Sequence, residues 1–462
     1  MSKKVYVNRT LNLRKIRYLG FDMDHTLVRY DTQAFEESTH KIVLEKLVAT
    51  KGYHKKILSL TFNYDLAIRG LVLDKKKGNL LKLSRHGAIR TSMHGTQAID
   101  YPTQKKIYGS KYIDLREGSY SSVDTAFSIS TAQLFAKLVE LKEKDGKLGL
   151  PDFETLASDI LNTVDDAHRD GSLKTIVREN LGKYIIKDES VVRGLERFRK
   201  HDKKLFLLTN SDFNYTKLLL DYAITPFLKQ FKHWSDLFEF VIVGAQKPRF
   251  FFDNLKFLEV NPKDGTMLNH DGKLVPGIYQ GGCASTFTRE LSLDGDDILY
   301  IGDHIYGDIL RLKKDCNWRT AMVIEGLEEE ITKYKEVQPL QKKIDALMAK
   351  KEPLENEHVE LMTQKIESGK NISEDKIAKL QKQILIFDKD IVELIRKQQS
   401  AFNPYWGEMM RVGNEESYFA NQVDRFACIY MAKISDFLTC SPRTYFRAPR
   451  QPLTHELMLD LL

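Results

Sequence analysis

The sequence predicts an α/β fold in which a doubly wound parallel sheet carries a large inserted cap domain and a protruding helical hairpin. Three observations support this fold class. Short, continuous apolar runs alternate with helical stretches, a long segment separates the first run from the second, and a Lys- and Glu-rich segment with coiled-coil spacing follows the last run. Continuous apolar runs indicate strands that are buried on both faces, as in parallel sheets covered by helices.

Four apolar runs of strand length form the predicted sheet. They are Ile16–Asp22, Leu205–Thr209, Phe238–Gly244 and Ile298–Asp303. Helical stretches at Val191–Lys200 and Phe213–Ala223 precede the second and third runs. Ligands of such sheets bind at the carboxyl ends of the strands. Polar residues follow each run at this end, namely Asp22, Thr209, the loop that contains Lys247, and Asp303.

The chain divides into three predicted parts. The interval between Asp22 and Thr209 is far longer than one crossover needs, so we expect an inserted cap at residues 41–184. Residues 10–40, 185–327 and 401–450 then form the catalytic core. Residues 328–400 repeat apolar side chains at spacings of three and four in two arms, which predicts an antiparallel hairpin with a structural or oligomerising role. Asn371 and Glu374 are placed as a capping pair at its turn.

Composition narrows the classes of function. The chain has 462 residues, of which 42% are hydrophobic, and a formal charge of +7 from 71 basic and 64 acidic side chains. This balance excludes wholesale disorder and argues against a dedicated nucleic-acid-binding protein. No apolar run approaches the roughly 20 residues of a membrane helix, and the N-terminus lacks the apolar core of a signal peptide. The cysteines form no C-x-x-C pair. We therefore expect a cytoplasmic protein with free thiols and with neither nucleic-acid nor membrane partners.

The segment FDMDHTL places two carboxylates, Asp22 and Asp24, at the end of the first predicted strand. Asp22 can attack phosphorus as a nucleophile and ligate Mg²⁺. Asp24 can act as the general acid for a leaving alkoxide and then as the base for water. Two solvated acids that cap a strand-to-turn junction are the simpler interpretation of this segment alone.

Three further motifs follow in order. LFLLTNS places Thr209 and Asn210 where a hydroxyl and turn amides can hold phosphoryl oxygens. Lys247 in GAQKPRFF can neutralise the phosphate. YIGDHIYGD places Asp303 and Asp308, whose hard oxygens suit Mg²⁺, after the last strand. Taken singly, Thr209 could be a helix cap and Lys247 a surface charge, but their common order indicates a phosphoryl-transfer site.

This set of motifs resembles the haloacid dehalogenase superfamily of aspartate-nucleophile phosphatases. The blocks FDMDHTL, RGLVLDKKKGNLLKL, LLTNSDFNYT, LYIGDHIYGDIL and FANQVDRFACIY look like the cytosolic purine 5′-nucleotidase family, which acts on IMP and GMP. The resemblance extends from near residue 10 to near residue 450. It implies a phosphoric monoester hydrolase that forms an aspartyl-phosphate, with Mg²⁺ on Asp22, the backbone carbonyl of Asp24 and Asp303, and with Asp308 in support. It also implies a homo-oligomer, either a dimer or a tetramer.

The same resemblance implies a purine site in the cap. Phe127 and His168 would stack on the base, and Asp165 would accept a hydrogen bond from its N1–H edge. Lys174 would reach the phosphate, and Ser211 would contact phosphate or ribose beside Asn210. The alternatives are a core phenylalanine, a satisfied surface histidine and a solvated lysine.

The sequence departs from this family at three places. Leu161 stands where the family has an arginine, Ser128 stands where it has an asparagine, and the chain ends in HELMLDLL without an acidic tail. These departures leave base preference and nucleotide activation open.

Other functions remain possible at this stage. A phosphorylated receiver module has a different motif order and lacks the acid two residues after the phosphorylated aspartate. An inactive scaffold would not need both Asp22 and Asp24. Transfer of phosphate to a nucleoside, or hydrolysis of another phosphomonoester, would use the same residues.

Overall fold

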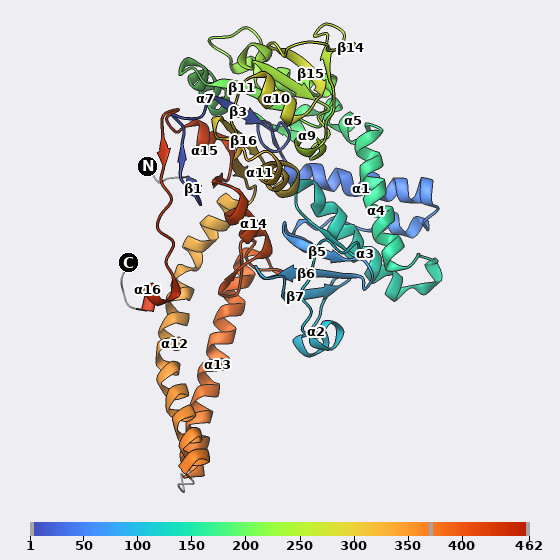
Figure 1. The fold of residues 1–462 in the computed structure, drawn as a ribbon. Helices are drawn as coiled ribbons and strands as arrows, with labels where there is room; N and C mark the ends of the chain where they lie inside the picture. Colours follow the sequence, from blue (N-terminus) through green and yellow to red (C-terminus); the bar gives the residue numbers. More distant parts are fainter. Residues whose placement is uncertain (1–3, 369–372, 459–462) are drawn as a thin grey trace.

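The computed structural model describes residues 4–368 and 373–458. Its largest sheet is built from β1 (Val5–Val7), β3 (Tyr18–Phe21), β11 (Lys204–Leu208), β12 (Phe240–Val243), β13 (Phe257–Val260), β14 (Met267–Asn269), β15 (Gly277–Gly281), β16 (Ile298–Gly302), β17 (Arg319–Val323) and β20 (Ile429–Met431). The order is β1-β20-β17-β16-β3-β11-β12-β15-β13-β14 (Figure 1). All pairings from β20 to β15 are parallel, and the pairings outside them are antiparallel.

The four predicted strands are confirmed as β3, β11, β12 and β16, and the two predicted helices as α7 (Glu189–Lys200) and α8 (Phe213–Ala223). All residues of β3, β12 and β16 are buried, because apolar clusters cover both faces of the sheet. Gly20 in β3 is required by close packing, since a Cβ there would lie 2.2 Å from the ring of Phe206. These features confirm the predicted α/β fold, with a parallel sheet covered on both faces.

A second, antiparallel sheet lies within residues 71–122. It consists of β5 (Leu71–Asp74), β6 (Asn79–Leu83), β7 (Ile89–His94), β8 (Gln97–Ala98) and β9 (Tyr120–Ser122), in the order β8-β7-β6-β5-β9. The helices α1 (Thr32–Lys51), α3 (Ile129–Lys144) and α4 (Phe153–Arg169) share a separate apolar core with this sheet. This unit stands beside the large sheet at the side where β3 ends (Figure 1).

The predicted hairpin is confirmed as α12 (Leu327–Ser368) and α13 (Glu374–Phe402), which lie against each other and project from the body (Figure 1). Ion pairs join the arms, including Lys351 with Asp388 and Lys376 with Glu357. The capping partner predicted at Asn371 lies outside the described residues. Within the described part of the chain, no helix is long and apolar enough to span a membrane.

Candidate active site

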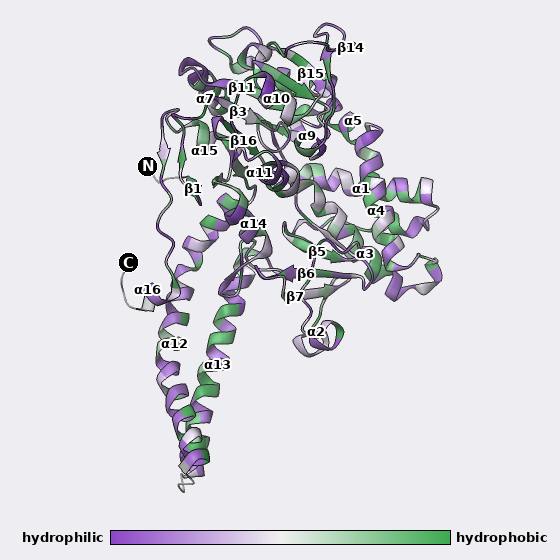
Figure 2. Ribbon diagram, in the orientation of Figure 1, coloured by the Kyte–Doolittle hydropathy of each residue, from purple (hydrophilic) through white to green (hydrophobic). Residues whose placement is uncertain are grey.

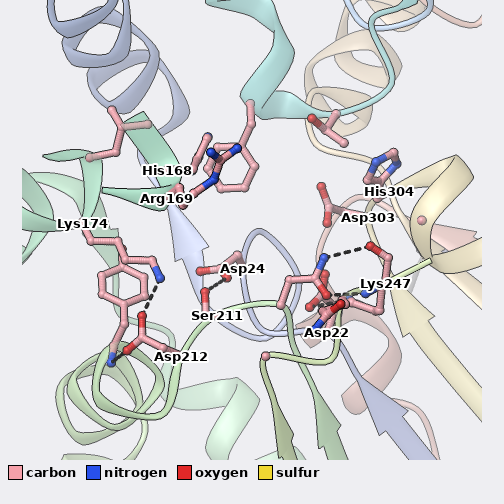
Figure 3. Close-up of a pocket in the computed structure, with 18 of the residues that line it drawn as sticks. Asp22, Asp24, His168, Arg169, Lys174, Ser211, Asp212, Lys247, Asp303 and His304 are labelled. Carbon is pink, nitrogen blue, oxygen red and sulfur yellow. Dashed lines mark hydrogen bonds and ion pairs between the residues drawn. The ribbon is translucent and has the colours of Figure 1, made fainter. Parts of the chain in front are cut away.

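The carboxyl ends of β3, β11 and β16 lie side by side because Phe21 is in register with both Leu207 and Ile301. A cavity of about 790 Å³ opens at this edge of the sheet. Core and cap both contribute to its wall. Eleven of the predicted site residues line it: Asp22, Asp24, Asn210, Ser211, Lys247, Asp303 and Asp308 from the core, and Phe127, Asp165, His168 and Lys174 from the cap. Figure 3 labels Asp22, Asp24, Ser211, Lys247, Asp303, His168 and Lys174 among them.

Three buried carboxylates form the floor of the cavity. One oxygen each of Asp22, Asp303 and Asp308 lies within 4.8 Å of the other two. Burial raises the pKa of Asp22 well above its usual value, and it also raises the pKa of Asp303. Asp303 Oδ2 is buried without a hydrogen-bond partner. Such a set of oxygen acceptors fits a hard divalent cation, which would relieve their repulsion and occupy the unpaired oxygen.

Lys247 supplies the positive charge of the cluster. Its Nζ lies 2.8 Å from Asp22 Oδ1 and 2.7 Å from Asp308 Oδ1. Burial alone would lower the Lys247 pKa, but the two carboxylates outweigh burial and raise it. The loop that carries Lys247 is tied to the end of β11, because its backbone N–H donates to Asn210 Oδ1 at 2.6 Å and its carbonyl accepts from Asn210 Nδ2 at 3.1 Å. The lysine is therefore fixed from both ends.

Both oxygens of Asp24 accept hydrogen bonds. The Tyr30 hydroxyl donates to Oδ1 at 2.6 Å, and the Ser211 hydroxyl donates to Oδ2 at 2.8 Å (Figure 3). The Tyr30 hydroxyl also lies 3.1 Å from that of Tyr215. Burial, followed by the charge of Asp24, raises the Tyr30 pKa well above its usual value, so this hydroxyl stays protonated. The carboxylate of Asp24 is thus oriented by groups that the sequence motifs did not include.

A second pair of missed residues supports the turn after Asp24. His25 has a left-handed backbone with φ of 54°, and its Nδ1 lies 3.0 Å from Glu325 Oε2. Burial would lower the His25 pKa, but the hydrogen bond to Glu325 raises it. In turn, His25 holds the pKa of Glu325 at about 2 against the effect of burial. The charged pair therefore anchors the loop that positions Asp22 and Asp24.

Thr209 is the exception among the predicted residues. Its side chain is fully buried, and it does not line the cavity. Its hydroxyl oxygen accepts the backbone N–H of Ser211 at 3.1 Å. The turn after β11 therefore presents the next two residues, Asn210 and Ser211, and uses Thr209 to hold its shape.

The cap wall brings the expected base-binding side chains together, although the two rings touch each other. The rings of Phe127 and His168 meet edge to face, with centroids 5.7 Å apart and planes at 80°. Phe127 also meets the ring of His25 edge-on at 4.2 Å. Burial lowers the pKa of His168. Asp165 lies one helical turn before His168 in α4 and lines the same cavity.

Three further cap residues, Lys174, Leu161 and Ser128, lie in or beside the cavity. Lys174 forms an ion pair with Asp212 at 2.5 Å, and its ammonium lies 5.3 Å from the centre of the Tyr215 ring. Leu161 and Ser128 line a neighbouring cavity of about 200 Å³, which also touches Asp165. The two departures from the expected pattern therefore lie beside Asp165, one of the residues expected to contact the base.

Known proteins place this site in a family. The profile of the 5′ nucleotidase family matches residues 5–458. The "5'-nucleotidase domain-containing protein 2" of Homo sapiens is 27% identical over 476 residues, which cover 98% of this chain and 85% of that protein. The protein of the same name from Rattus norvegicus is 26% identical over 471 residues, covering 98% and 80%.

Solved structures are more distant. A predicted phosphoglycolate phosphatase from Haemophilus somnus has a TM-score of 0.29 at 11% identity, covering 67% of this chain and 85% of its own. A putative β-phosphoglucomutase from Thermotoga maritima has a TM-score of 0.26 at 12% identity, covering 67% and 86%. The family profile, in contrast, spans nearly the whole sequence. The chain belongs to the 5′ nucleotidase family.

Proposed function

We propose that this protein is a Mg²⁺-dependent 5′-nucleotidase that hydrolyses purine nucleoside 5′-monophosphates, with IMP and GMP preferred. Membership of the 5′ nucleotidase family supports phosphomonoester hydrolysis. The observation that carries the chemistry is the buried Asp22 carboxylate, which Lys247 holds at 2.8 Å in the cavity that also contains Asp24.

In the first step, a carboxylate oxygen of Asp22 attacks phosphorus in line with the leaving 5′-oxygen, and Asp24 protonates that oxygen. Mg²⁺, bound by Asp22, the Asp24 carbonyl and Asp303 with Asp308 in support, would neutralise phosphate charge and let an anionic nucleophile approach. Lys247 stabilises the negative charge that the transferring group carries. The product is an aspartyl-phosphate and a free nucleoside.

In the second step, Asp24 removes a proton from water, which attacks the aspartyl-phosphate and releases phosphate. Asn210 and Ser211 line the cavity beside Asp24 and offer donors to phosphoryl oxygens. We assign Thr209 a supporting role, because its buried hydroxyl fixes the N–H of Ser211.

We further propose that the cap selects the base. Phe127 and His168 would flank the purine, and Asp165 would accept the N1–H of a 6-oxopurine. AMP has no proton on N1, so Asp165 would lose this hydrogen bond. Asp165 is exposed in the structure, and losing a hydrogen bond to a carboxylate that keeps access to water costs about 0.5–1.5 kcal/mol, a preference of roughly 2- to 13-fold.

The four cysteines are free, which supports a reducing, cytoplasmic compartment. The proposed partners are small nucleotides, with no role for nucleic acid or a membrane.

A phosphate-release screen over nucleoside monophosphates tests this function. We expect the order IMP and GMP, then AMP, then CMP and UMP, and we expect EDTA to abolish turnover. Asp22→Asn serves as the inactive control, and p-nitrophenyl phosphate reports the chemistry without a base. Equal rates with IMP and AMP would reject the base site alone. No release from any phosphomonoester would reject the hydrolase.

The same phospho-enzyme could pass its phosphate to a nucleoside instead of water, so transferase activity is the alternative. Adding inosine to a reaction that contains another nucleotide distinguishes the two, because a transferase would form IMP.

A further inference from the structure

A second cavity borders the active-site cavity, and we call it the back cavity. Its volume is about 200 Å³. The two cavities share four lining residues, which are Thr125, Phe127, Asp165 and His168. Three of the four, Phe127, Asp165 and His168, are the side chains proposed to contact the purine base. A base held by these three side chains therefore lies next to the back cavity, to which the proposed function gives no role.

The back cavity is a recess into the buried part of the cap. Leu73 of β5, Val123 and Val164 of α4 line it, and their exposed fractions are 2%, 1% and 8%. Leu161, one helical turn before Asp165 in α4, lines it as well. Hydrophobic residues are frequent on β5 and α3, which share the apolar core of the cap (Figure 2). Apolar side chains therefore form much of the wall of the back cavity.

This lining suits a small apolar group. Three of its hydroxyl groups are already engaged, because Ser122 donates to Asp124 at 2.7 Å and the hydroxyls of Thr125 and Ser128 lie 3.0 Å apart. The leucine and valine side chains supply hydrocarbon surface, which is stabilised by contact with an apolar ligand. A cavity of about 150 Å³ holds a molecule of benzene. The back cavity therefore has room for a substituent of up to about this size.

The position of Asp165 determines which substituent can enter. Asp165 is proposed to accept the N1–H of a 6-oxopurine, so the groups on the two flanking ring carbons, C2 and C6, point toward the wall that the two cavities share. An alkyl group on the 6-oxygen removes the N1 proton and with it the hydrogen bond to Asp165. An alkyl group on the 2-amino nitrogen of guanine leaves both the N1–H and the 6-oxo group in place. The hydrogen bond to Asp165 and a filled back cavity are therefore compatible for a 2-amino substituent.

We propose that the protein also hydrolyses guanosine 5′-monophosphates that carry an alkyl group on the 2-amino nitrogen, and that the back cavity binds this group. The inference rests on the proposed function, from which it takes the orientation of the base. Phe127 and His168 line both cavities and touch each other, so the ring displacement that admits a purine also opens the back cavity to its substituent. The reaction itself is unchanged: water cleaves the phosphate ester, and the products are phosphate and the N2-alkylated nucleoside.

Phosphate release from IMP, GMP, N2-methyl-GMP and N2-benzyl-GMP by the full-length protein tests the proposal. We expect kcat/KM for both alkylated nucleotides to lie within about threefold of the value for GMP, whereas a filled wall at this position would reject them by roughly 10- to 200-fold. Release from IMP and GMP with rejection of the alkylated nucleotides would overturn this inference and leave the proposed function standing. No release from any of the four nucleotides would overturn both.

Substitutions in the lining show whether the alkyl group occupies the back cavity or points to solvent. Leu161→Trp narrows the cavity from α4, and it should lower the ratio of kcat/KM for N2-benzyl-GMP to that for GMP by about 10-fold or more. Ser121→Phe narrows it from β9 and should repeat the effect. Asn162→Trp is the matched control, because Asn162 is the next residue of α4 and is exposed.

Circular dichroism and hydrolysis of p-nitrophenyl phosphate identify any variant that does not fold. The ratio should stay at the wild-type value in Asn162→Trp. An unchanged ratio in folded Leu161→Trp or Ser121→Phe, or an equal loss in Asn162→Trp, would overturn the proposal, since the alkyl group would then lie outside the back cavity.

Discussion

Removing the positive charge of Lys247 gives the sharpest test of the electrostatics of the site. Lys247→Met keeps the length and most of the volume of the side chain but removes the ammonium. The lysine side chain is 4% exposed, and the carboxylates that it contacts, Asp22 and Asp308, are 12% and 1% exposed. The substitution therefore leaves buried carboxylates close together without their counter-charge.

The magnitude follows from the two ion pairs. At 2.7–2.8 Å, each pair is worth roughly 6 kcal/mol of attraction for an effective dielectric constant of about 20. Most of this attraction offsets the cost of burying the ammonium, which the variant no longer bears. Breaking a buried pair by removing one partner costs about 3–5 kcal/mol in free energy of unfolding, and we expect a loss of this size in the absence of divalent cations.

The pH dependence has a definite sign. Burial already raises the Asp22 pKa although Lys247 opposes the shift, so the variant should raise it further. A group whose pKa is higher in the folded than in the unfolded state stabilises the fold at low pH, and this stability is lost as pH rises through the folded-state value. The difference between wild type and variant should therefore be smaller at pH 5 than at pH 8.

Urea unfolding in EDTA at both pH values measures this difference. Lys204→Met is the matched control, since that lysine is 47% exposed and lies 3.3 Å from Glu239; we expect less than about 1 kcal/mol there. Added Mg²⁺ should recover part of the stability of Lys247→Met. A loss below about 1 kcal/mol at pH 8, or one that is equal at both pH values, would refute the reasoning.

Three further predictions concern the proposed chemistry. Asp22→Asn should fold normally and retain less than about a hundredth of wild-type turnover, measured as phosphate release. Asp24→Asn should slow IMP hydrolysis by a factor of about 10²–10⁴, and with p-nitrophenyl phosphate it should accumulate phospho-enzyme; equal amounts in mutant and wild type by mass spectrometry would contradict its role. Asp165→Ala should flatten the IMP/AMP ratio of kcat/KM and leave p-nitrophenyl phosphate hydrolysis within about twofold.

The sequence was sufficient for the four adjacent central strands of the sheet, β16, β3, β11 and β12, and for most of the cavity wall. A parallel strand buried on both faces has one apolar pattern, and its carboxyl end is the point at which that pattern stops. Because parallel strands end at the same edge, residues as distant in the sequence as Asp22 and Asp303 could be placed at one site before any contact was known. The inserted cap followed from length alone, since one crossover does not need that much chain.

The supporting contacts could not be predicted in this way. Tyr30 reaches Asp24 because the chain folds back at β4 (Arg29–Tyr30), and Tyr215 reaches Tyr30 from α8. Neither tyrosine belongs to a spacing that implies a hydrogen bond. The buried position of Thr209 was also not predictable, because strand position specifies where a turn begins but not which of its side chains points outward.

The ring contact between Phe127 and His168 leads to a last prediction. Their 5.7 Å separation and 80° angle are those of a direct edge-to-face pair, which leaves no space for a base between them. If a purine binds between them as proposed, one ring must turn. Phe127 is held by His25, Tyr30 and Phe35, with centroids 4.2, 5.9 and 5.1 Å away, so we expect His168 to move.

The two rings should then differ in a way that activity assays can detect. His168→Ala should lower kcat/KM for IMP by about 2- to 10-fold through lost stacking and leave p-nitrophenyl phosphate hydrolysis nearly unchanged. Phe127→Leu removes a ring that packs on His25, directly after Asp24, and should displace the nucleophile loop. It should therefore slow both substrates, on the order of 10-fold or more. If Phe127→Leu affects IMP alone, the ring serves the base and not the loop, and the assignment of the moving side chain is wrong.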